Sequence, residues 1–401
     1  MRRHRTEEPF LSEIQHFLLF DNMEELNVSR TDRQQSWLPK IVEAALSGEQ
    51  KKLEIVLVRA IRSLKNEAPD VCQQLGQLLS EHSTNPNGLR WRGSGPPPVD
   101  ADEGFALVRA ESVDDAPAPV LPTSVLRRVE QFISQRKNCG RLLEEGFLPP
   151  GSVLLTGAPG TGKTMLTRWI ARELGLPFVT LDLTTSISSF LGKTGLNLRR
   201  TLDYARSRPC VLLLDEFDAI AKRRDDASEV GELKRIVNVL LKELEDWPLQ
   251  SVLIAATNHP ELLDRAIARR FDVVLDIPLP GDDERLEILK RSGRRFSDDV
   301  PAGLLHAVAC SLEGASGSEL DSLMSAAVRH HLATEQILVR SLLEEIQLRL
   351  GERLTSKNIG EFIRRIQSKT NGVFKVRELA ELLGKSPSTI QHHLNKEVQH
   401  G

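Results

Sequence analysis

The chain has 401 residues, which is too long for one ordinary hydrophobic core and predicts two or three domains. Hydrophobic residues make up 40% of the chain and charged residues 27%, proportions that are typical of a globular protein. The formal net charge of −3 excludes a global field that would draw the chain to nucleic acid or to an anionic membrane. Any contact with DNA would therefore have to come from a local patch.

The four cysteines lie far apart in the sequence and form neither a CxxC pair nor a cluster with histidine, so a zinc site is not expected. Scattered cysteines are typical of buried, small apolar side chains in a reducing compartment. The basic N-terminus is followed only by the short apolar run 17–20, which is too short for a signal peptide, and no stretch is long enough to span a bilayer. We therefore expect a cytoplasmic protein.

The first 82 residues are expected to form a helical N-terminal domain. Apolar residues recur at helical spacing over 41–46 and again over 53–64, and Ser47-Gly48 marks a break between two helices. From Ser83 the composition changes to Asn, Pro, Gly and Ser, which is typical of a linker that polyproline partly stiffens. We place this linker at 83–117.

From residue 118 short apolar runs alternate with helical stretches. The runs expected to be strands are Ser152–Leu155, Phe178–Leu181, Val211–Leu214, Val252–Ala256 and Val273–Ile277. This alternation predicts an α/β fold, a parallel sheet covered by helices on both faces, over 118–280. After Pro280 only helices are expected, and they predict a small helical lid domain over 281–369. The expected lid helices are 283–293, 301–311, 317–332, 337–350 and 355–368.

The segment after the first strand matches the phosphate-binding pattern GxxxxGK[ST], and a helix is expected to begin directly after it. Its glycines allow successive backbone N–H groups to curl around phosphates. Lys163 is placed to reach the β- and γ-phosphate oxygens, and the Thr164 hydroxyl is placed to ligate Mg²⁺. We therefore predict an ATP and Mg²⁺ site that contains Gly157, Ala158, Pro159, Gly160, Thr161, Gly162, Lys163, Thr164 and Met165.

A second part of the site is expected where the strand 211–214 ends in Asp215-Glu216, because open α/β sheets bind ligands at the carboxyl ends of their strands. Asp215 is predicted to hold Mg²⁺ through its water shell, and Glu216 to polarise the attacking water. The next strand ends in Thr257-Asn258, and the Asn258 amide is expected to orient that water. This last assignment depends on the first two, since a lone Asn at a strand end is usually a turn residue.

Four motifs in a fixed order make the chain resemble the AAA family of ATPases over about residues 118–335. They are GAPGTGKT, LLLDEFDAI, LIAATNHPELLDRAIARRFD and EGASGSEL. The resemblance implies a ring, usually of six subunits, with each ATP at a subunit interface and a polypeptide substrate remodelled at the central pore. It places Asn258 at the sensor-1 position, Arg269 and Arg270 at the arginine-finger positions that serve a neighbour's ATP, and Gly317 in the sensor-2 segment near the base and ribose.

The resemblance also assigns residues to the pore. Phe190, Leu191 and Gly192 resemble a first pore loop whose aromatic ring grips an extended chain, and the alternative is a loop Phe packed on the core. The charged segment 223–232 fits a second pore loop or a solvated charge run. The adjacent arginine pair replaces the Arg-x-Gly-Arg fingers of the best-known members, which leaves the dominant finger open.

The C-terminal segment 370–401 resembles a helix-turn-helix, in which Ala380 permits close helix approach, Gly384 supplies the turn and Ile390 fixes the second helix. That second helix carries no arginine, and few cations lie near it. Specific DNA readers usually carry clustered Arg and Lys for phosphate contacts. Contact with DNA and docking on a protein therefore stay equal alternatives.

The sequence thus predicts an ATPase that remodels or unfolds a protein client in a homo-hexameric ring, with residues 1–82 choosing the client. The layout resembles ATPases that act beside a separately encoded effector, such as a protease in a defence or plasmid-maintenance system. The alternative function, of a different class, is an ATP-switched DNA-binding regulator that uses the C-terminal helix-turn-helix.

Overall fold

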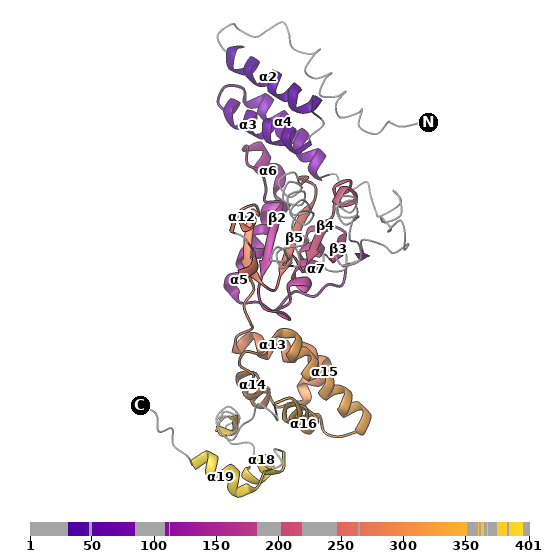
Figure 1. The fold of residues 1–401 in the computed structure, drawn as a ribbon, viewed down its shortest axis with the longest axis vertical. Helices are drawn as coiled ribbons and strands as arrows, with labels where there is room; N and C mark the ends of the chain where they lie inside the picture. Colours follow the sequence, from indigo (N-terminus) through magenta and orange to yellow (C-terminus); the bar gives the residue numbers. More distant parts are fainter. Residues whose placement is uncertain are drawn as a thin grey trace, which may run out of the picture.

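The computed structural model describes residues 31–47, 50–84, 109–111, 113–182, 202–218, 247–263, 265–350, 360, 362–364, 367, 375–382 and 385–395. Three parts follow one another in Figure 1: the N-terminal helices, an α/β domain, and a helical lid that ends in the C-terminal tail. Within the described ranges, no helix is both long enough and apolar enough to cross a membrane.

A six-stranded sheet in the order β1-β3-β4-β5-β2-β6 forms the centre of the α/β domain. The strands are β1 (Arg109–Glu111), β2 (Ser152–Thr156), β3 (Phe178–Asp182), β4 (Val211–Asp215), β5 (Val252–Thr257) and β6 (Val273–Asp276). Strands β2 to β6 are parallel and coincide with the predicted apolar runs. The central strands β2 and β5 are buried at every position, which explains why their sequences do not alternate between apolar and polar residues.

Strand β1 differs from the prediction. It pairs with β3 in the antiparallel sense, with Arg109 opposite Thr180 and Glu111 opposite Phe178. The segment 83–117 therefore does not act as a linker throughout, because its residues 109–111 form an edge of the sheet. A strand of three residues is too short to reveal a period in its sequence, so composition alone assigned it to the linker.

Alternate residues of the strands β2, β3, β4 and β5 supply two separate cores. Leu213 belongs to a cluster that packs against α5 (Thr123–Lys137) and α7 (Lys163–Leu174) on one face. Its neighbours Leu212 and Leu214 belong to a cluster on the other face. Because successive side chains of a strand point to opposite faces, one apolar run builds both layers.

The N-terminal helices share a core with the α/β domain. They are α2 (Thr31–Leu46), α3 (Gln50–Leu64) and α4 (Pro69–Thr84), and α4 packs on α6 (Cys139–Glu144). A Cβ atom on Gly76 would lie 2.9 Å from the Cα of Glu144, so α4 approaches α6 more closely than any other residue would allow. Lys51 Nζ donates a hydrogen bond to the carbonyl of Trp247 at 2.9 Å, and Arg62 Nη2 donates one to the carbonyl of Gly146 at 2.7 Å.

The lid and the tail are built around a single cluster of apolar side chains. Their helices are α13 (Asp282–Gly293), η4 (Arg294–Asp299), α14 (Ala302–Ser311), α15 (Gly317–Thr334), α16 (Leu338–Leu350), α18 (Val376–Leu382) and α19 (Pro387–Asn395). Figure 1 places this unit at the opposite end of the α/β domain from the N-terminal helices. Leu379, Ala380 and Ile390 of the tail are buried in the cluster, whereas Gly384 lies outside the described residues. The predicted helix 355–368 is described only in part.

The cysteines are buried, as the sequence predicted. Cys72 and Cys139 lie in the core that the N-terminal helices share with α6. Burial raises the pKa of the Cys210 thiol to about 12, which leaves it protonated and unreactive at neutral pH. These side chains therefore act as small apolar groups.

Candidate nucleotide-binding site

The loop between β2 and α7 owes its shape to three glycines. The φ angle is +147° at Gly157, +76° at Gly160 and +94° at Gly162, values that side chains with a Cβ atom rarely adopt. A Cβ atom on Gly157 would lie 2.2 Å from the carbonyl oxygen of Ile277, so this loop is pressed against the segment that follows β6. No side chain caps the start of α7, which leaves its first backbone N–H groups available to an anion.

Lys163 is buried at the start of α7, with only 7% of its surface exposed. Its Nζ atom donates hydrogen bonds to the carbonyls of Gly157 at 2.7 Å and Ala158 at 2.9 Å. Burial lowers the pKa of this lysine below its usual value, while the charges of Asp215 and Asp218 act in the opposite direction. A buried ammonium held mainly by neutral carbonyls fits a triphosphate, because phosphate oxygens supply the countercharge and stronger hydrogen bonds.

The carboxylate of Asp215 lies beside the Thr164 hydroxyl. Thr164 Oγ1 and Asp215 Oδ2 are 3.4 Å apart, where the end of β4 meets the start of α7. Hydroxyl and carboxylate oxygens are ligands that Mg²⁺ accepts, together with phosphate oxygens and water. Within the described parts of the chain, no group of three or more His, Cys, Asp or Glu side chains could hold a metal by itself. A magnesium ion here would therefore need oxygens from a nucleotide and from water.

Glu216 follows Asp215 in an unusual backbone conformation. Its φ angle is +53°, which costs about 1–2 kcal/mol for a residue with a Cβ atom. Its backbone N–H donates to Asp215 Oδ1 at 2.9 Å, and the next residue, Phe217, donates to the carbonyl of Ala256 at 2.9 Å. These bonds hold the Glu216 side chain exposed at the carboxyl end of β4, the end of the sheet where the phosphate loop lies.

Asp218 is a site residue that the sequence analysis did not select. It is 4% exposed, and its Oδ1 atom accepts hydrogen bonds from Thr257 Oγ1 at 3.1 Å and from the backbone N–H of Asn258 at 3.4 Å. The carboxylate thus fixes Asn258 to the segment that follows β4. The available signal was the second aspartate of LLLDEFDAI, three positions after Asp215.

The lid touches the phosphate loop at the start of α15. Ser318 donates a backbone hydrogen bond to the carbonyl of Gly160 at 3.1 Å, and a Cβ atom on Gly317 would lie 3.2 Å from the same carbonyl oxygen. Ser316 and Glu319 form a capping box that fixes this helix end. The structure therefore places Gly317 against the phosphate loop.

Arg269 and Arg270 lie at the other end of the sheet. Both are exposed and follow α12 (Arg265–Ala268). Asp272 accepts hydrogen bonds from the backbone N–H groups of Gly151 at 2.8 Å and Ser152 at 3.0 Å, at the start of β2. A strand of five residues, about 16 Å, separates this start from the phosphate loop. The arginine pair is thus far from its own chain's loop and faces outward.

The predicted pore residues Phe190, Leu191 and Gly192 lie outside the described residues, as does the segment 223–232. The site described here therefore consists of the phosphate loop, the ends of β4 and β5, and the start of α15.

Two parts of the chain match known families. Residues 153–279 match the ATPase family associated with various cellular activities (AAA), and residues 370–396 match the arsR family of bacterial regulatory proteins. Over 321 residues the chain is 31% identical to "Uncharacterized AAA family ATPase y4kL" of Sinorhizobium fredii, a match that covers 78% of this chain and 91% of the relative.

Other relatives match over shorter parts. The chain is 38% identical to "ATP-dependent zinc metalloprotease FtsH" of Acidothermus cellulolyticus, over 51% of this chain and 32% of the relative. It is 34% identical to "Proteasome-activating nucleotidase" of Methanothermobacter thermautotrophicus, over 50% of this chain and 51% of the relative. The chain thus spans about half of that nucleotidase and about a third of that protease.

The fold has a counterpart among solved structures. The crystal structure of the FIGL-1 AAA domain aligns with a TM-score of 0.50 and 23% sequence identity, covering 60% of this chain and 85% of that one, which is a likeness of fold. The match to y4kL extends over nearly all of that relative and includes the phosphate loop and the strands around it. The chain therefore belongs to the AAA family and is an ATPase, which hydrolyses ATP to ADP and phosphate.

Proposed function

We propose that this ATPase works as a ring of identical subunits, six in number, that couples ATP hydrolysis to the remodelling or unfolding of a protein client. The observation that carries the proposal is the separation of the arginine pair from the phosphate loop by the full length of β2. An ATP site that needs an arginine to stabilise charge on the γ-phosphate must then take it from a neighbour. The names of relatives with similar ATPase segments include a proteasome-activating nucleotidase and an ATP-dependent protease.

Within one site the residues divide the chemistry as follows. The backbone of 157–162 and Lys163 bind the phosphates, and Thr164 and Asp215 hold Mg²⁺, which neutralises charge on the phosphate oxygens when it is bound. Glu216 takes up a proton as water attacks, and Asn258 orients that water. Arg269 or Arg270 of the next subunit completes the site.

The client would be gripped by Phe190 in the first pore loop and selected by the N-terminal helices. The shared core of α4 and α6 supports this arrangement, since a client held by these helices would be held directly against the ATPase domain. A separately encoded effector, such as a protease in a defence or plasmid-maintenance system, would act on the released or unfolded chain.

The proposal is tested with a trap for the ATP-bound ring. Glu216→Gln should retain ATP in an assembled ring, and capture from a lysate followed by mass spectrometry should identify a polypeptide that wild type releases on hydrolysis. The captured client is then purified and labelled, and its unfolding by wild type is followed by fluorescence. Phe190→Ala should abolish unfolding while ATP turnover continues. A Glu216→Gln protein that stays monomeric with ATP would reject the ring.

A second candidate function, DNA binding through the tail, is favoured by the arsR match and by the surface of α19. Its exposed residues Ser388, Gln391, His392 and Asn395 follow helical spacing and form one polar face. The opposite face is buried through Ile390. Such a face suits contact with base edges in a major groove, although its few cations leave the phosphate contacts to a multivalent ring.

This candidate is tested with fragments of the genome that encodes the protein. The Glu216→Gln ring with ATP is incubated with the fragments, and the retained DNA is sequenced. A protein that lacks 374–401 and the double variant Gln391→Ala/His392→Ala should both lose selective retention. Equal retention by all three proteins would reject DNA reading by the tail.

A further inference from the structure

Two aromatic rings connect the candidate catalytic glutamate with the arginine pair. Phe217 follows Glu216 and Phe271 follows Arg270 in the sequence. Their rings meet edge to face, with centroids 5.8 Å apart and an interplanar angle of 82°. Phe217 is 1% exposed and Phe271 is 6% exposed, so the contact is inside the core. It bridges two ends of the sheet that β2 otherwise separates.

Each ring belongs to the residue that directly follows a candidate functional residue, and its backbone N–H makes a hydrogen bond. The backbone N–H of Phe217 is held by the carbonyl of Ala256, and that of Phe271 donates to the carbonyl of Ala268 at 3.3 Å. Glu216 has a left-handed backbone conformation, which costs free energy and persists only because the surrounding structure holds it.

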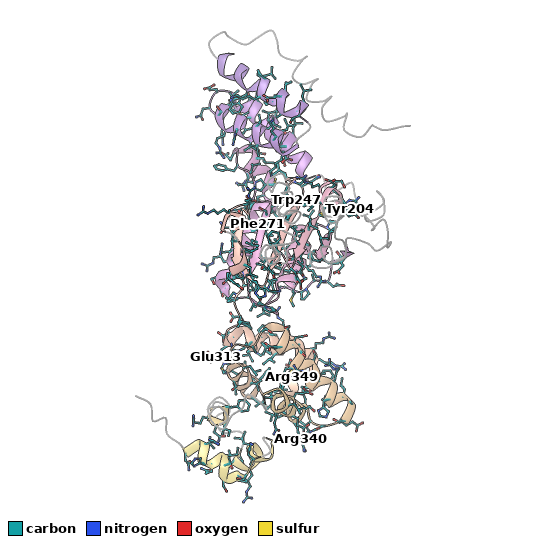
Figure 2. All side chains as sticks on the ribbon, in the orientation of Figure 1. Tyr204, Trp247, Phe271, Glu313, Arg340 and Arg349 are labelled. Carbon is teal, nitrogen blue, oxygen red and sulfur yellow. The ribbon has the colours of Figure 1, made fainter. Side chains whose placement is uncertain are left out.

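Other buried side chains of the same cluster surround the two rings. Trp247 and Ile267 belong to the same buried group as the two rings, and Figure 2 shows Trp247 and Phe271 in the part of the α/β domain nearest the N-terminal helices. Close-packed cores shift between discrete arrangements rather than deform continuously. In such a core, a displacement of Phe217 favours a matching displacement of Phe271, with which it is in contact.

We infer that Phe217 and Phe271 are positioning residues that link a subunit's own ATP site to the arginine pair it offers to the next subunit. The inference rests on the proposed roles of Glu216 and Arg270. When Glu216 changes its contacts as ATP is bound or hydrolysed, the Phe217–Phe271 pair transmits the change to Arg270. Hydrolysis in one subunit then alters the site of its neighbour, and turnover around the ring is cooperative.

A double-mutant cycle isolates this contact. Phe217→Leu and Phe271→Leu should each lower kcat by about three- to tenfold, the range expected for loss of an aromatic pair, with unchanged affinity for ATP. The double variant should be no slower than the slower single variant, because either change already breaks the contact. The Hill coefficient for ATP should fall towards one in all three variants.

The matched control is Phe132→Leu, the same substitution at a buried position that belongs to the cluster on the other face of the sheet. It should lower the melting temperature as the other variants do, yet leave kcat and the Hill coefficient unchanged. If a leucine variant does not fold, methionine at the same positions preserves side-chain volume better and completes the cycle.

Mixed rings separate effects on a subunit's own site from effects on its neighbour. In an excess of Glu216→Gln subunits, each Phe271→Leu subunit receives an intact arginine pair, so its turnover should equal that of wild type diluted in the same way. The same recovery is expected for Phe217→Leu, because the broken contact acts through the arginine pair that the variant subunit offers to its neighbour.

Two outcomes overturn the inference. Independent effects, with the fold losses of the single variants multiplying in the double variant, would exclude a shared contact. A persistent defect of Phe271→Leu in mixed rings would exclude action through the arginine pair. Failure of the proposed function would give a different result. Normal ATP turnover by the double variant Arg269→Ala/Arg270→Ala would show that neither arginine acts on the ATP of a neighbouring subunit.

Discussion

Replacing Gly160 by alanine should separate the lid from the phosphate loop. Gly160 has a φ angle of +76°, and a Cβ atom there would lie 2.2 Å from Ser318 Oγ and 2.8 Å from Ser316 Oγ. The Ser318 side chain can rotate away, but Ser316 is held by its capping box with Glu319. The new methyl group therefore pushes the start of α15 away from the loop.

The size of the effect follows from a comparison with Gly175. Gly175 has a φ angle of +65°, and a Cβ atom there would meet nothing within 4 Å, so Gly175→Ala destabilises the protein only by the backbone strain of about 1–2 kcal/mol. Gly160→Ala introduces a similar strain and also removes the 3.1 Å hydrogen bond from the Ser318 N–H to the Gly160 carbonyl, which contributes about 1 kcal/mol. Strain in the helix cap adds about 1 kcal/mol more.

Two measurements distinguish the variants. Urea denaturation should give a free energy of unfolding that is lower by about 1–2 kcal/mol for Gly175→Ala and by about 3–4 kcal/mol for Gly160→Ala. The affinity for a non-hydrolysable ATP analogue should fall about 30-fold for Gly160→Ala only, since about 2 kcal/mol of lid contact is lost. Equal affinities for the two variants would refute the view that this contact supports nucleotide binding.

Three further changes test other parts of the structure. Because burial lowers the pKa of Lys163, its ammonium should lose its proton at a lower pH than that of an ordinary lysine. The affinity for an ATP analogue, measured between about pH 7 and 10, should therefore fall as the pH rises through that lowered pKa, and Lys163→Arg should abolish this fall. Asp218→Ala leaves the buried Thr257 hydroxyl without its acceptor, so it should lower the free energy of unfolding by about 1–3 kcal/mol and slow ATP turnover. An unchanged urea denaturation curve would contradict this role. Gly76→Leu should overpack the contact of α4 with α6 and lower the free energy of unfolding by about 1–3 kcal/mol. Proteolysis between the N-terminal helices and the ATPase domain should then be faster than in wild type, whereas an unaltered melting temperature would show that the helices are not held there.

The parallel strands and the phosphate loop were predictable because local sequence determines them. A run such as Val211–Leu214 is apolar throughout since both faces of the sheet are covered, and the loop needs glycine wherever φ is positive. The lid helices likewise carry clear helical periods, and their observed bounds differ from the predicted ones by one or two residues at most positions.

Features that depend on distant contacts were not predictable. Strand β1 exists because β3 offers it an edge, and three residues carry no period of their own. The close approach at Gly76 depends on Glu144, and the burial of Asp218 depends on Thr257 at the end of another strand. The meeting of Phe217 with Phe271 is equally a property of the folded core. In each case the decisive partner is far away in the sequence.

The common core of the lid and the tail fixes the C-terminal helices to the lid. Ile390 and Leu379 are buried among lid residues such as Leu343, so α19 cannot swivel without opening a close-packed interior. The same packed unit contacts the phosphate loop through the backbone N–H of Ser318. A tilt of α15 against that loop would therefore displace α19 farther than it displaces the start of α15.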